Sequence, residues 1–133
     1  MTTTESIWVN LIDGALGPSP IRPDGDACGA WVVFDGVVRR QEQDRPLEAL
    51  RYTAYEPMAQ NVLRDLAESV RETHGLLCVI VEHSRGVVPV GACSFRLCIG
   101  AAHRKEALAA MDEFIDRMKQ DVPIWKEPVW AAT

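Results

Sequence analysis

The segment Leu76-Leu-Cys-Val-Ile-Val-Glu82 decides the fold of this chain. Its apolar run is rich in β-branched residues and too short for a typical helix, so it is predicted to be a central strand. Gly75 precedes it and is well placed to end a helix. A second strand is predicted at Cys93 to Gly100, after the break at Pro89-Val-Gly91. The sequence patterns before and after these two strands predict the remaining helices and strands.

Two helices are predicted, one before and one after this pair of strands in the sequence. The first starts at Glu56-Pro57, because Pro is tolerated in a first turn, and runs to about His74-Gly75. The second runs from about His103 to Gln120, and Val122-Pro123 ends it. The expected apolar faces are formed by Met58, Val62, Leu63, Leu66, Ala67 and Val70 in the first helix, and by Leu108, Met111, Ile115 and Met118, with Ala107 and Phe114 alongside, in the second.

The remaining chain adds strands and one long loop. Ile7 to Ile12 is predicted to be a short strand, and the Pro and Gly density of residues 14–26 predicts a surface loop. Cys28 to Val38 is expected to be a largely buried strand, and Leu47 to Tyr55 a second, antiparallel one. A short strand follows the second helix. This order predicts an α+β fold, with one antiparallel or mixed sheet covered by two main helices, in a single domain of 133 residues.

Composition excludes several classes of protein. The net charge of -5 argues against a nucleic-acid binder that relies on bulk electrostatics. The apolar runs fall far short of the roughly 20 residues that span a bilayer, so no membrane helix is expected. Met1 to Ser6 lacks the basic start and apolar stretch of a secretory signal, which predicts a cytoplasmic protein. The four cysteines have no CxxC spacing and are interpreted as reduced thiols; no metal and no cofactor are implied.

Two lysines are candidates for chemistry in a chain that has only three, against eleven arginines. Lys119 falls in the last turn of the second helix, where a cation also interacts favourably with the helix dipole without any further role. Lys126 follows the apolar run 122–125. Desolvation beside a buried aromatic wall would lower its pKa and make it a better nucleophile or proton donor, whereas a snorkelling lysine would have no such role.

Two basic pairs are candidates for anion binding. His103-Arg104 opens the second helix, where free backbone N–H groups attract anions, although both side chains could instead be solvated or paired with Glu106. Arg39-Arg40 ends a strand, where an Arg pair can bind a phosphate through two hydrogen bonds or can be ordinary surface charge. Neither pair decides the function by itself.

Six segments carry a specific combination of residues: Gly29-Ala30, Phe34-Asp-Gly-Val-Val-Arg39, Leu50-Arg-Tyr-Thr-Ala-Tyr-Glu-Pro-Met-Ala59, Val88-Pro-Val-Gly91, Ala102-His-Arg104 and Val122-Pro-Ile-Trp-Lys126. The most specific is Pro-Ile-Trp-Lys after a helix that opens with His-Arg. In order and spacing, these segments resemble the catalytic (large) subunit of molybdopterin synthase. The resemblance covers about residues 28–128, nearly the whole domain, and implies an α/β-hammerhead type of fold.

The resemblance implies a sulfur-transfer enzyme of molybdenum cofactor biosynthesis. Its substrate would be cyclic pyranopterin monophosphate (precursor Z), which receives the two dithiolene sulfurs of molybdopterin. Sulfur would arrive on a small ubiquitin-like subunit as a C-terminal Gly-Gly thiocarboxylate. Two copies of the large subunit would form the central dimer of a heterotetramer. Alternatives are a catalytically silent scaffold for a ubiquitin-like partner and an unrelated domain that binds a phosphorylated ligand.

The resemblance also assigns roles to individual residues. Arg39, His103 and Arg104 are expected to form the anion pocket for the substrate, with backbone contacts from Val37 and Val38. Lys119 and Lys126 match the two essential lysines of the family. Lys119 is expected near the thiocarboxylate and Lys126 on the pterin side, with Glu127 and Pro128 completing the substrate-binding set.

Three features depart from the family pattern. In His83-Ser-Arg85 the arginine is shifted by one position relative to many members, and Ala92 stands where a Glu usually follows Val-Pro-Val-Gly. The chain also ends at Thr133, whereas longer members carry a tail that reaches toward the neighbouring subunit. A basic residue contributed across the dimer by such a tail is therefore not identified.

Overall fold

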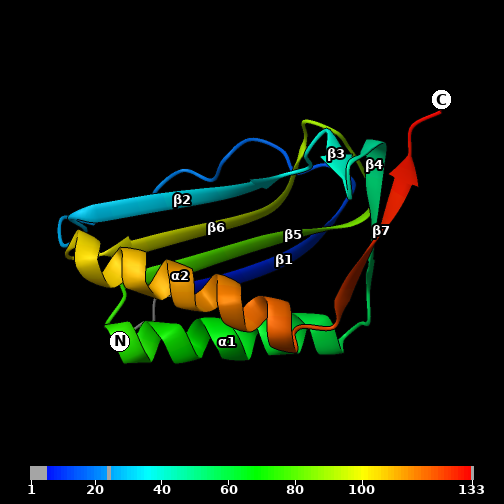
Figure 1. The fold of residues 1–133 in the computed structure, drawn as a ribbon. Coiled ribbons are helices and arrows are strands. Elements are labelled where there is room, and N and C mark those ends of the chain that lie inside the picture. The colour runs from blue at the N-terminus through cyan, green and yellow to red at the C-terminus, as the bar shows by residue number, and fades with distance from the viewer. Residues whose placement is uncertain (1–5, 24, 133) are drawn as a thin grey trace.

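A computed structural model gives the fold of residues 6–23 and 25–132. Seven strands form one mixed sheet, and two antiparallel helices cover one of its faces (Figure 1). The expected α+β class is confirmed. Residues 1–5, which make up most of the segment on which the prediction of no secretory signal rests, lie outside the described part of the chain, as does Asp24 in the predicted loop. Within the described residues, neither helix is both long and apolar enough to cross a membrane.

The strand β5 (Cys78–Pro89) organises the sheet, as its apolar sequence predicts. It pairs in parallel with β1 (Ile7–Asp13) and antiparallel with β6 (Cys93–Ala101), whose other side pairs with β2 (Ala30–Val37). The last residues of β5 instead pair with β4 (Arg45–Ala54). β4 also pairs with β7 (Ile124–Trp130) and the short β3 (Gln41–Glu42). β5 is longer than predicted because its polar second half continues the pairing.

The two helices bury their apolar stripes against the sheet. α1 (Met58–His74) ends at Gly75, whose left-handed backbone (φ 66°) caps the helix as predicted. α2 (Arg104–Asp121) runs beside it in the opposite direction (Figure 1). The core between helices and sheet includes Leu63, Leu97, Ile99 and Phe114, all fully buried. A smaller cluster, formed by Val38, Leu47, Leu50 and Val88, lies at the β4 end.

Two details of the predicted burial are wrong. Leu108, expected on the apolar face of α2, is 52% exposed, because the face that meets the sheet is centred on Ala107, Ala110, Met111 and Phe114. The strand predicted as largely buried from Cys28 to Val38 is an edge strand with exposed Val33, Phe34 and Val37. Apolar content alone does not distinguish an edge strand from a central one, since both can be rich in Val and Phe. β2 and β4 are antiparallel to their partners but do not pair with each other.

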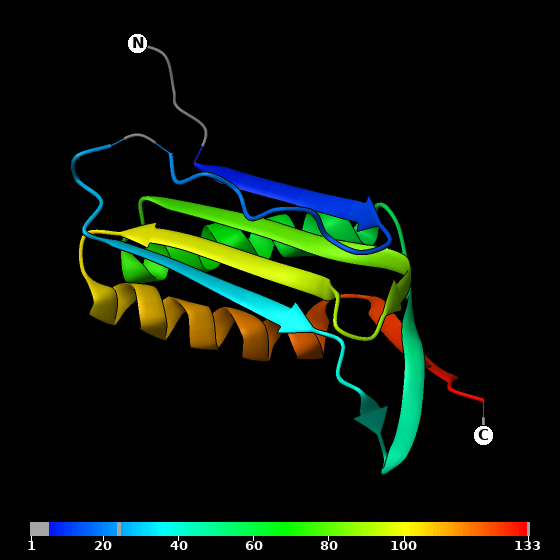
Figure 2. The ribbon, with the colours of Figure 1, turned by 90° about the horizontal axis from the view of Figure 1, so that it is seen from above.

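The Pro-rich loop after β1 crosses the sheet face opposite the helices (Figure 2). Arg96 of β6, only 5% exposed, holds it there. Its guanidinium donates to the carbonyl oxygens of Gly17 and Pro18 at 2.9 and 3.2 Å and pairs with Asp35 and Glu82. A buried arginine is tolerated because each charge is paired and hydrogen-bonded. The loop is therefore packed by polar contacts where its sequence offers few apolar ones.

Gly29, directly before β2, gives a test of how closely the backbone packs at this end of the sheet. A Cβ on Gly29 would lie 2.3 Å from the carbonyl oxygen of Ala102 and 3.4 Å from its carbonyl carbon, both of them backbone atoms. We expect Gly29→Ala to lower the free energy of unfolding by about 1–3 kcal/mol, since the chain must shift to relieve the overlap. Gly17→Ala is the matched control, because no atom lies within 4 Å of its added Cβ. Urea unfolding of both variants measures the difference; equal stability would contradict the close packing at Gly29.

Candidate active site

The junction between α2 and β7 brings Lys119 and Lys126 together. Val122 closes the last turn of α2 by donating from its N–H to the Met118 oxygen at 3.1 Å, and Pro123 prevents the helix from continuing. β7 then pairs with β4 so that Lys126 lies opposite Tyr52. Lys119, in the last turn of α2, and Lys126, on β7, therefore line the same two cavities.

Two adjoining cavities form the candidate site. The first, the His83 cavity, has a volume of about 380 Å³ and is lined by Tyr52, His83, Met118, Lys119, Val122, Ile124 and Lys126. The second, the Arg39 cavity, has a volume of about 460 Å³ and adds Val37, Arg39, Glu42 and Ser94 to four residues of the first. Residues shared by both cavities are Tyr52, Met118, Lys119 and Lys126. We call the two cavities together the two-lysine site.

Cations outnumber carboxylates in the two-lysine site. Arg39, Lys119 and Lys126 line it together with two carboxylates, Glu42 and Asp35. Asp35 is paired with Arg96, and Glu42 lies between Arg39 and Lys126. Glu42 Oε1 is 3.4 Å from Lys126 Nζ and 3.7 Å from the Arg39 guanidinium. The Arg39 side chain is 77% exposed and that of Lys126 55%. Such open, cationic groups can receive an anionic ligand that competes with Glu42.

The desolvation expected at Lys126 is absent. Its side chain is mostly exposed, and the neighbouring Trp125 is 58% exposed rather than part of a buried wall. β7 pairs only with β4 among the described strands, and its residues 125–128 are all exposed. The prediction of a buried aromatic environment is wrong, because the apolar run 122–125 leads into a strand with only one partner among the described strands, which leaves Trp125 exposed.

A buried aromatic group closes the floor of the His83 cavity. His83 is 7% exposed, and its ring meets Tyr52 edge-on with 5.3 Å between ring centroids. Phe95 packs against the same ring at 5.8 Å and continues to Phe114 in the core. Tyr52 Oη is 2.9 Å from Ser94 Oγ. Burial lowers the pKa of His83, opposed by its hydrogen bond to the Ser84 carbonyl, so the neutral imidazole is favoured.

Other residues of the predicted set take different positions. Val37 lines the Arg39 cavity and is 52% exposed. Val38 is buried, and its backbone groups are used: its N–H donates to the Ala92 oxygen at 3.0 Å, and its oxygen accepts from the Gly91 N–H at 2.9 Å. Glu127 and Pro128 continue β7 opposite Arg51 and Leu50 and line neither cavity.

His103 and Arg104 lie at the opposite end of α2 from Lys119. His103 precedes Lys119 by sixteen positions along α2, which corresponds to about 24 Å. They line a separate hollow with Gly29, Ala102 and Lys105. His103 Nδ1 is 3.5 Å from Glu106, the pairing that the sequence left open. The resemblance predicts one pocket for Arg39, His103 and Arg104. Within a single chain, His103 and Arg104 lie outside the cavity that Arg39 lines.

The departures from the family pattern lie away from the two-lysine site. Arg85 donates to Asp13 Oδ1 and Glu56 Oε1, both at 2.6 Å, and so joins the end of β1 to the start of α1. Ala92 sits in the turn between β5 and β6, and its side chain packs against the smaller apolar cluster. Neither residue lines the His83 or the Arg39 cavity.

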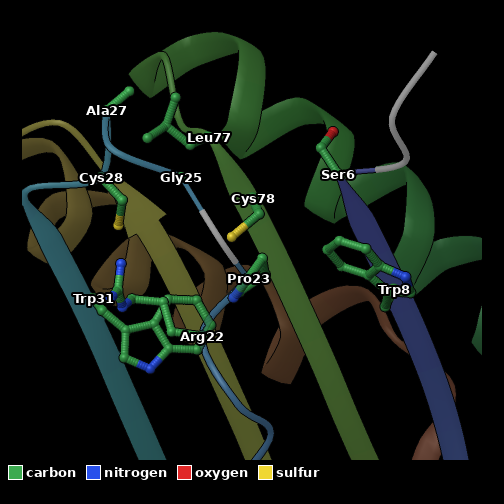
Figure 3. A pocket seen from close by; sticks show the side chains of 10 residues that line it. All are labelled: Ser6, Trp8, Arg22, Pro23, Gly25, Ala27, Cys28, Trp31, Leu77 and Cys78. Carbon is green, nitrogen blue, oxygen red and sulfur yellow. The ribbon is translucent and has the colours of Figure 1, made fainter. Parts of the chain in front are cut away.

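A further hollow of about 270 Å³ lies at the far end of the sheet. Trp31 of β2 and Trp8 of β1 stand on either side of Cys78 of β5, with Cys28 nearby (Figure 3). The described residues that line it include no lysine, histidine or carboxylate. Burial raises the pKa of Cys78, so its thiol is a poor nucleophile. All four cysteines are free, in agreement with the expected reduced thiols.

The two-lysine site can bind anions and stabilise a developing negative charge. Sequence patterns identified its cations, Arg39, Lys119 and Lys126, but missed Tyr52, His83 and Glu42 as parts of the site. A polar signal was available for His83, because a histidine within an apolar strand needs a partner or a cavity. The described residues hold no cluster of three or more metal-ligating side chains.

Comparison with known proteins gives consistent matches. Residues 16–121 match the family model described as MoaE protein. The molybdopterin synthase catalytic subunit of Nostoc sp. is 41% identical over 108 residues, which cover 80% of this chain and 66% of the relative. The human catalytic subunit is 35% identical over 103 residues, 77% of this chain and 55% of the relative. The chain thus spans somewhat more than half the length of these relatives.

Solved structures share the fold. Molybdopterin synthase from Staphylococcus aureus superposes with a TM-score of 0.76 at 28% identity, covering 96% of this chain and 92% of that one. A complex of subunits 1 and 2 of molybdopterin-converting factor from Helicobacter pylori gives 0.71 at 25% identity, covering 92% and 89%. The arrangement of strands and helices around the two-lysine site is therefore a recurring one.

The buried imidazole predicts a pH dependence of stability. The unfolded chain protonates His83 near its ordinary pKa of 6.5, whereas the folded pKa is lower. Between these values the unfolded state binds more protons, so this contribution is complete above about pH 6.5 and is lost as the pH falls toward the folded pKa. Urea unfolding from about pH 8 to pH 5 should show a smaller decline in His83→Gln than in the wild type.

His74 provides the control for this measurement. It lies on α1, pairs with Glu113 and lines neither cavity. His74→Gln should keep the decline that His83→Gln loses. Parallel pH curves for the wild type and His83→Gln would contradict a neutral buried imidazole at position 83.

Proposed function

The chain belongs to the MoaE family of molybdopterin synthase catalytic subunits, and we propose that it transfers sulfur to cyclic pyranopterin monophosphate. The donor is the C-terminal thiocarboxylate of a small ubiquitin-like subunit, and the product is the dithiolene of molybdopterin. The four free cysteines accord with action in the reducing cytoplasm. The protein uses no cofactor of its own, because the pyranopterin is its substrate.

The convergence of Lys119, Lys126 and Arg39 on one site carries this proposal. Both reactants are anions: the substrate has a cyclic phosphate, and the donor ends in a thiocarboxylate. A protein of net charge -5 must concentrate cations locally to bind two anions. The two adjoining cavities offer room for a heterocycle in one and the end of an extended peptide in the other.

The cations act by electrostatic stabilisation and proton donation. Lys119, in the last turn of α2, meets the thiocarboxylate and stabilises the anionic tetrahedral intermediate that forms at its carbon. Lys126 and Arg39 bind the pterin side, where the phosphate displaces the Glu42 carboxylate from its contacts with both. Val37 lies beside this ligand at the wall of the Arg39 cavity.

The small subunit is the proposed partner. The Helicobacter pylori structure is a complex of subunits 1 and 2 of molybdopterin-converting factor, and this chain resembles one of its chains. A flexible Gly-Gly tail is narrow enough to enter an open cleft and bring its terminal thiocarboxylate beside Lys119. A scaffold without turnover would need only the docking surface and not the cluster of cations.

A second copy of this chain supplies His103 and Arg104. Within one chain these residues lie about 24 Å from Lys119. They can contact the same substrate as Arg39 only if the start of α2 from another copy faces the two-lysine site. A two-fold dimer repeats this contact in both directions. The heterotetramer then has two complete sites, each built by two large subunits.

Removal of either lysine should abolish turnover and leave the fold intact. Both side chains are exposed, so Lys119→Ala and Lys126→Ala should unfold at the wild-type temperature. The assay mixes the protein with thiocarboxylated small subunit and precursor Z and detects molybdopterin by mass spectrometry. Arg51→Ala removes an exposed cation on β4 that lines neither cavity, and it should keep its activity. Product from Lys119→Ala would refute the assignment; partner binding without product from the wild type would favour the scaffold.

Mixing two inactive variants tests the second copy. Lys119→Ala and Arg104→Ala are each expected to be inactive alone. After exchange of subunits, a mixed dimer holds one pocket with both residues intact if Arg104 acts across the dimer. Random pairing then restores about a quarter of the wild-type rate. If both residues serve the same chain, every pocket lacks one of them, and the mixture stays inactive.

A further inference from the structure

Sulfur transfer from a thiocarboxylate requires a step that cations alone cannot perform. After the sulfur bonds to the substrate carbon, the carrier remains attached to it through its acyl group, as a thioester. Release of the carrier as a carboxylate takes one oxygen atom from water. The water must lose a proton as it attacks, so a base is needed beside the acyl carbon. This reasoning rests on the proposed function.

The lining of the His83 cavity contains one suitable base among the described residues. Ammonium groups such as those of Lys119 and Lys126 carry donors only and cannot accept a proton. Met118, Val122 and Ile124 are apolar. The phenol of Tyr52 is paired with Ser94. The imidazole of His83 is the remaining lining group. The two carboxylates of the other cavity are both paired, Glu42 with Lys126 and Arg39, and Asp35 with Arg96.

Hydrogen bonding fixes which nitrogen of His83 is basic. Nδ1 lies 2.8 Å from the carbonyl oxygen of Ser84, which can only accept, so Nδ1 carries the proton. The lone pair is therefore on Nε2. Nε2 has no hydrogen-bond partner among the described residues. The one fully buried side-chain nitrogen or oxygen without a partner among them is Gln60 Oε1, so Nε2 is not fully buried and is accessible from the cavity. Tyr52 and Phe95 hold the ring in place.

We infer that His83 is the general base that activates the water which releases the small subunit from the transferred sulfur. Nε2 takes a proton from water as its oxygen bonds to the acyl carbon. The acyl carbon–sulfur bond then breaks, and its electron pair stays on the sulfur, which receives the proton from Nε2. The carrier leaves as a carboxylate after losing its second proton to solvent. Lys119 stabilises the oxyanion during the attack.

The surroundings of His83 suit this role. The charged or titratable groups that face it are Lys119 from α2, Lys126 from β7 and Tyr52 from β4. Burial lowers the pKa of His83, so the neutral ring that can accept a proton is favoured when water arrives. After it takes a proton, the same burial favours its return to the sulfur.

Single-turnover kinetics with the complete complex test the inference. The wild type, His83→Gln and the control His74→Gln are each mixed with thiocarboxylated small subunit and precursor Z. Intact mass spectrometry follows both the covalent carrier–substrate adduct and the released carboxylate form of the carrier. In His83→Gln the adduct should form and accumulate, and its release should slow by about 100-fold. His74→Gln should behave as the wild type.

Chemical rescue separates a base from a structural residue. His83→Ala leaves space in the cavity, and added imidazole should restore part of the release rate, with an increase toward higher pH as the free imidazole loses its proton. Circular dichroism confirms that each variant is folded before assay. Release at the wild-type rate in His83→Gln, or failure of a folded variant to form the adduct at all, would overturn the inference. A wild type that forms neither adduct nor product overturns the proposed function and this inference with it.

A spectroscopic readout is independent of turnover. Nitrogen-15 NMR of histidine-labelled protein, assigned by the spectrum of His83→Gln, distinguishes the two imidazole nitrogens. We expect a protonated Nδ1 and an unprotonated Nε2 at neutral pH. A proton on Nε2 would remove the base and overturn the inference, whatever the kinetics.

Discussion

The pairing of β5 is the constraint on which the rest of the structure depends. Its first half lies between β1 and β6 in the main part of the sheet, and its last residues turn to β4. Backbone groups in such a strand are satisfied only if all its neighbours are in place. β4 in turn fixes β7, which carries Lys126. The position of a surface lysine thus depends on a buried strand far from it in sequence.

A chain of aromatic contacts links this buried strand to the candidate site. Phe114 of α2 stacks on Phe95, which meets His83, which meets Tyr52. These rings occupy the boundary between the core and the His83 cavity. Movement of α2 against the sheet would therefore displace the imidazole as well as Lys119. A rigid packed core is how a small domain can hold reacting groups in place beside an open cleft.

The site separates two electrostatic tasks. Exposed cations at its rim, Arg39 and Lys126, contact Glu42 and can exchange this contact for an anionic ligand at little cost, since exposed ion pairs are weak. The buried floor carries a neutral imidazole instead. A charged group at this buried position would carry a large desolvation cost, whereas a neutral imidazole does not and can still accept a proton. The start of α2, with His103 and Arg104, lies outside both cavities of the same chain.

The sequence by itself determined the class of fold, the two helices with their ends, the central strand and the cations of the site. These follow from local physics: hydrophobic period, the left-handed cap at Gly75, the break at Pro123 and the scarcity of lysine. Only the tertiary structure decided that Phe34 lies on an edge strand, that Leu108 faces away from the sheet, and which side chains share a cavity. Strand order depends on contacts between residues far apart in sequence, which no local pattern contains. For that reason the pattern found Lys119 and Lys126, but only the pairing of β4 with β3, β5 and β7 placed His83 and Glu42 beside them. The same fold leaves His103 at the far end of α2.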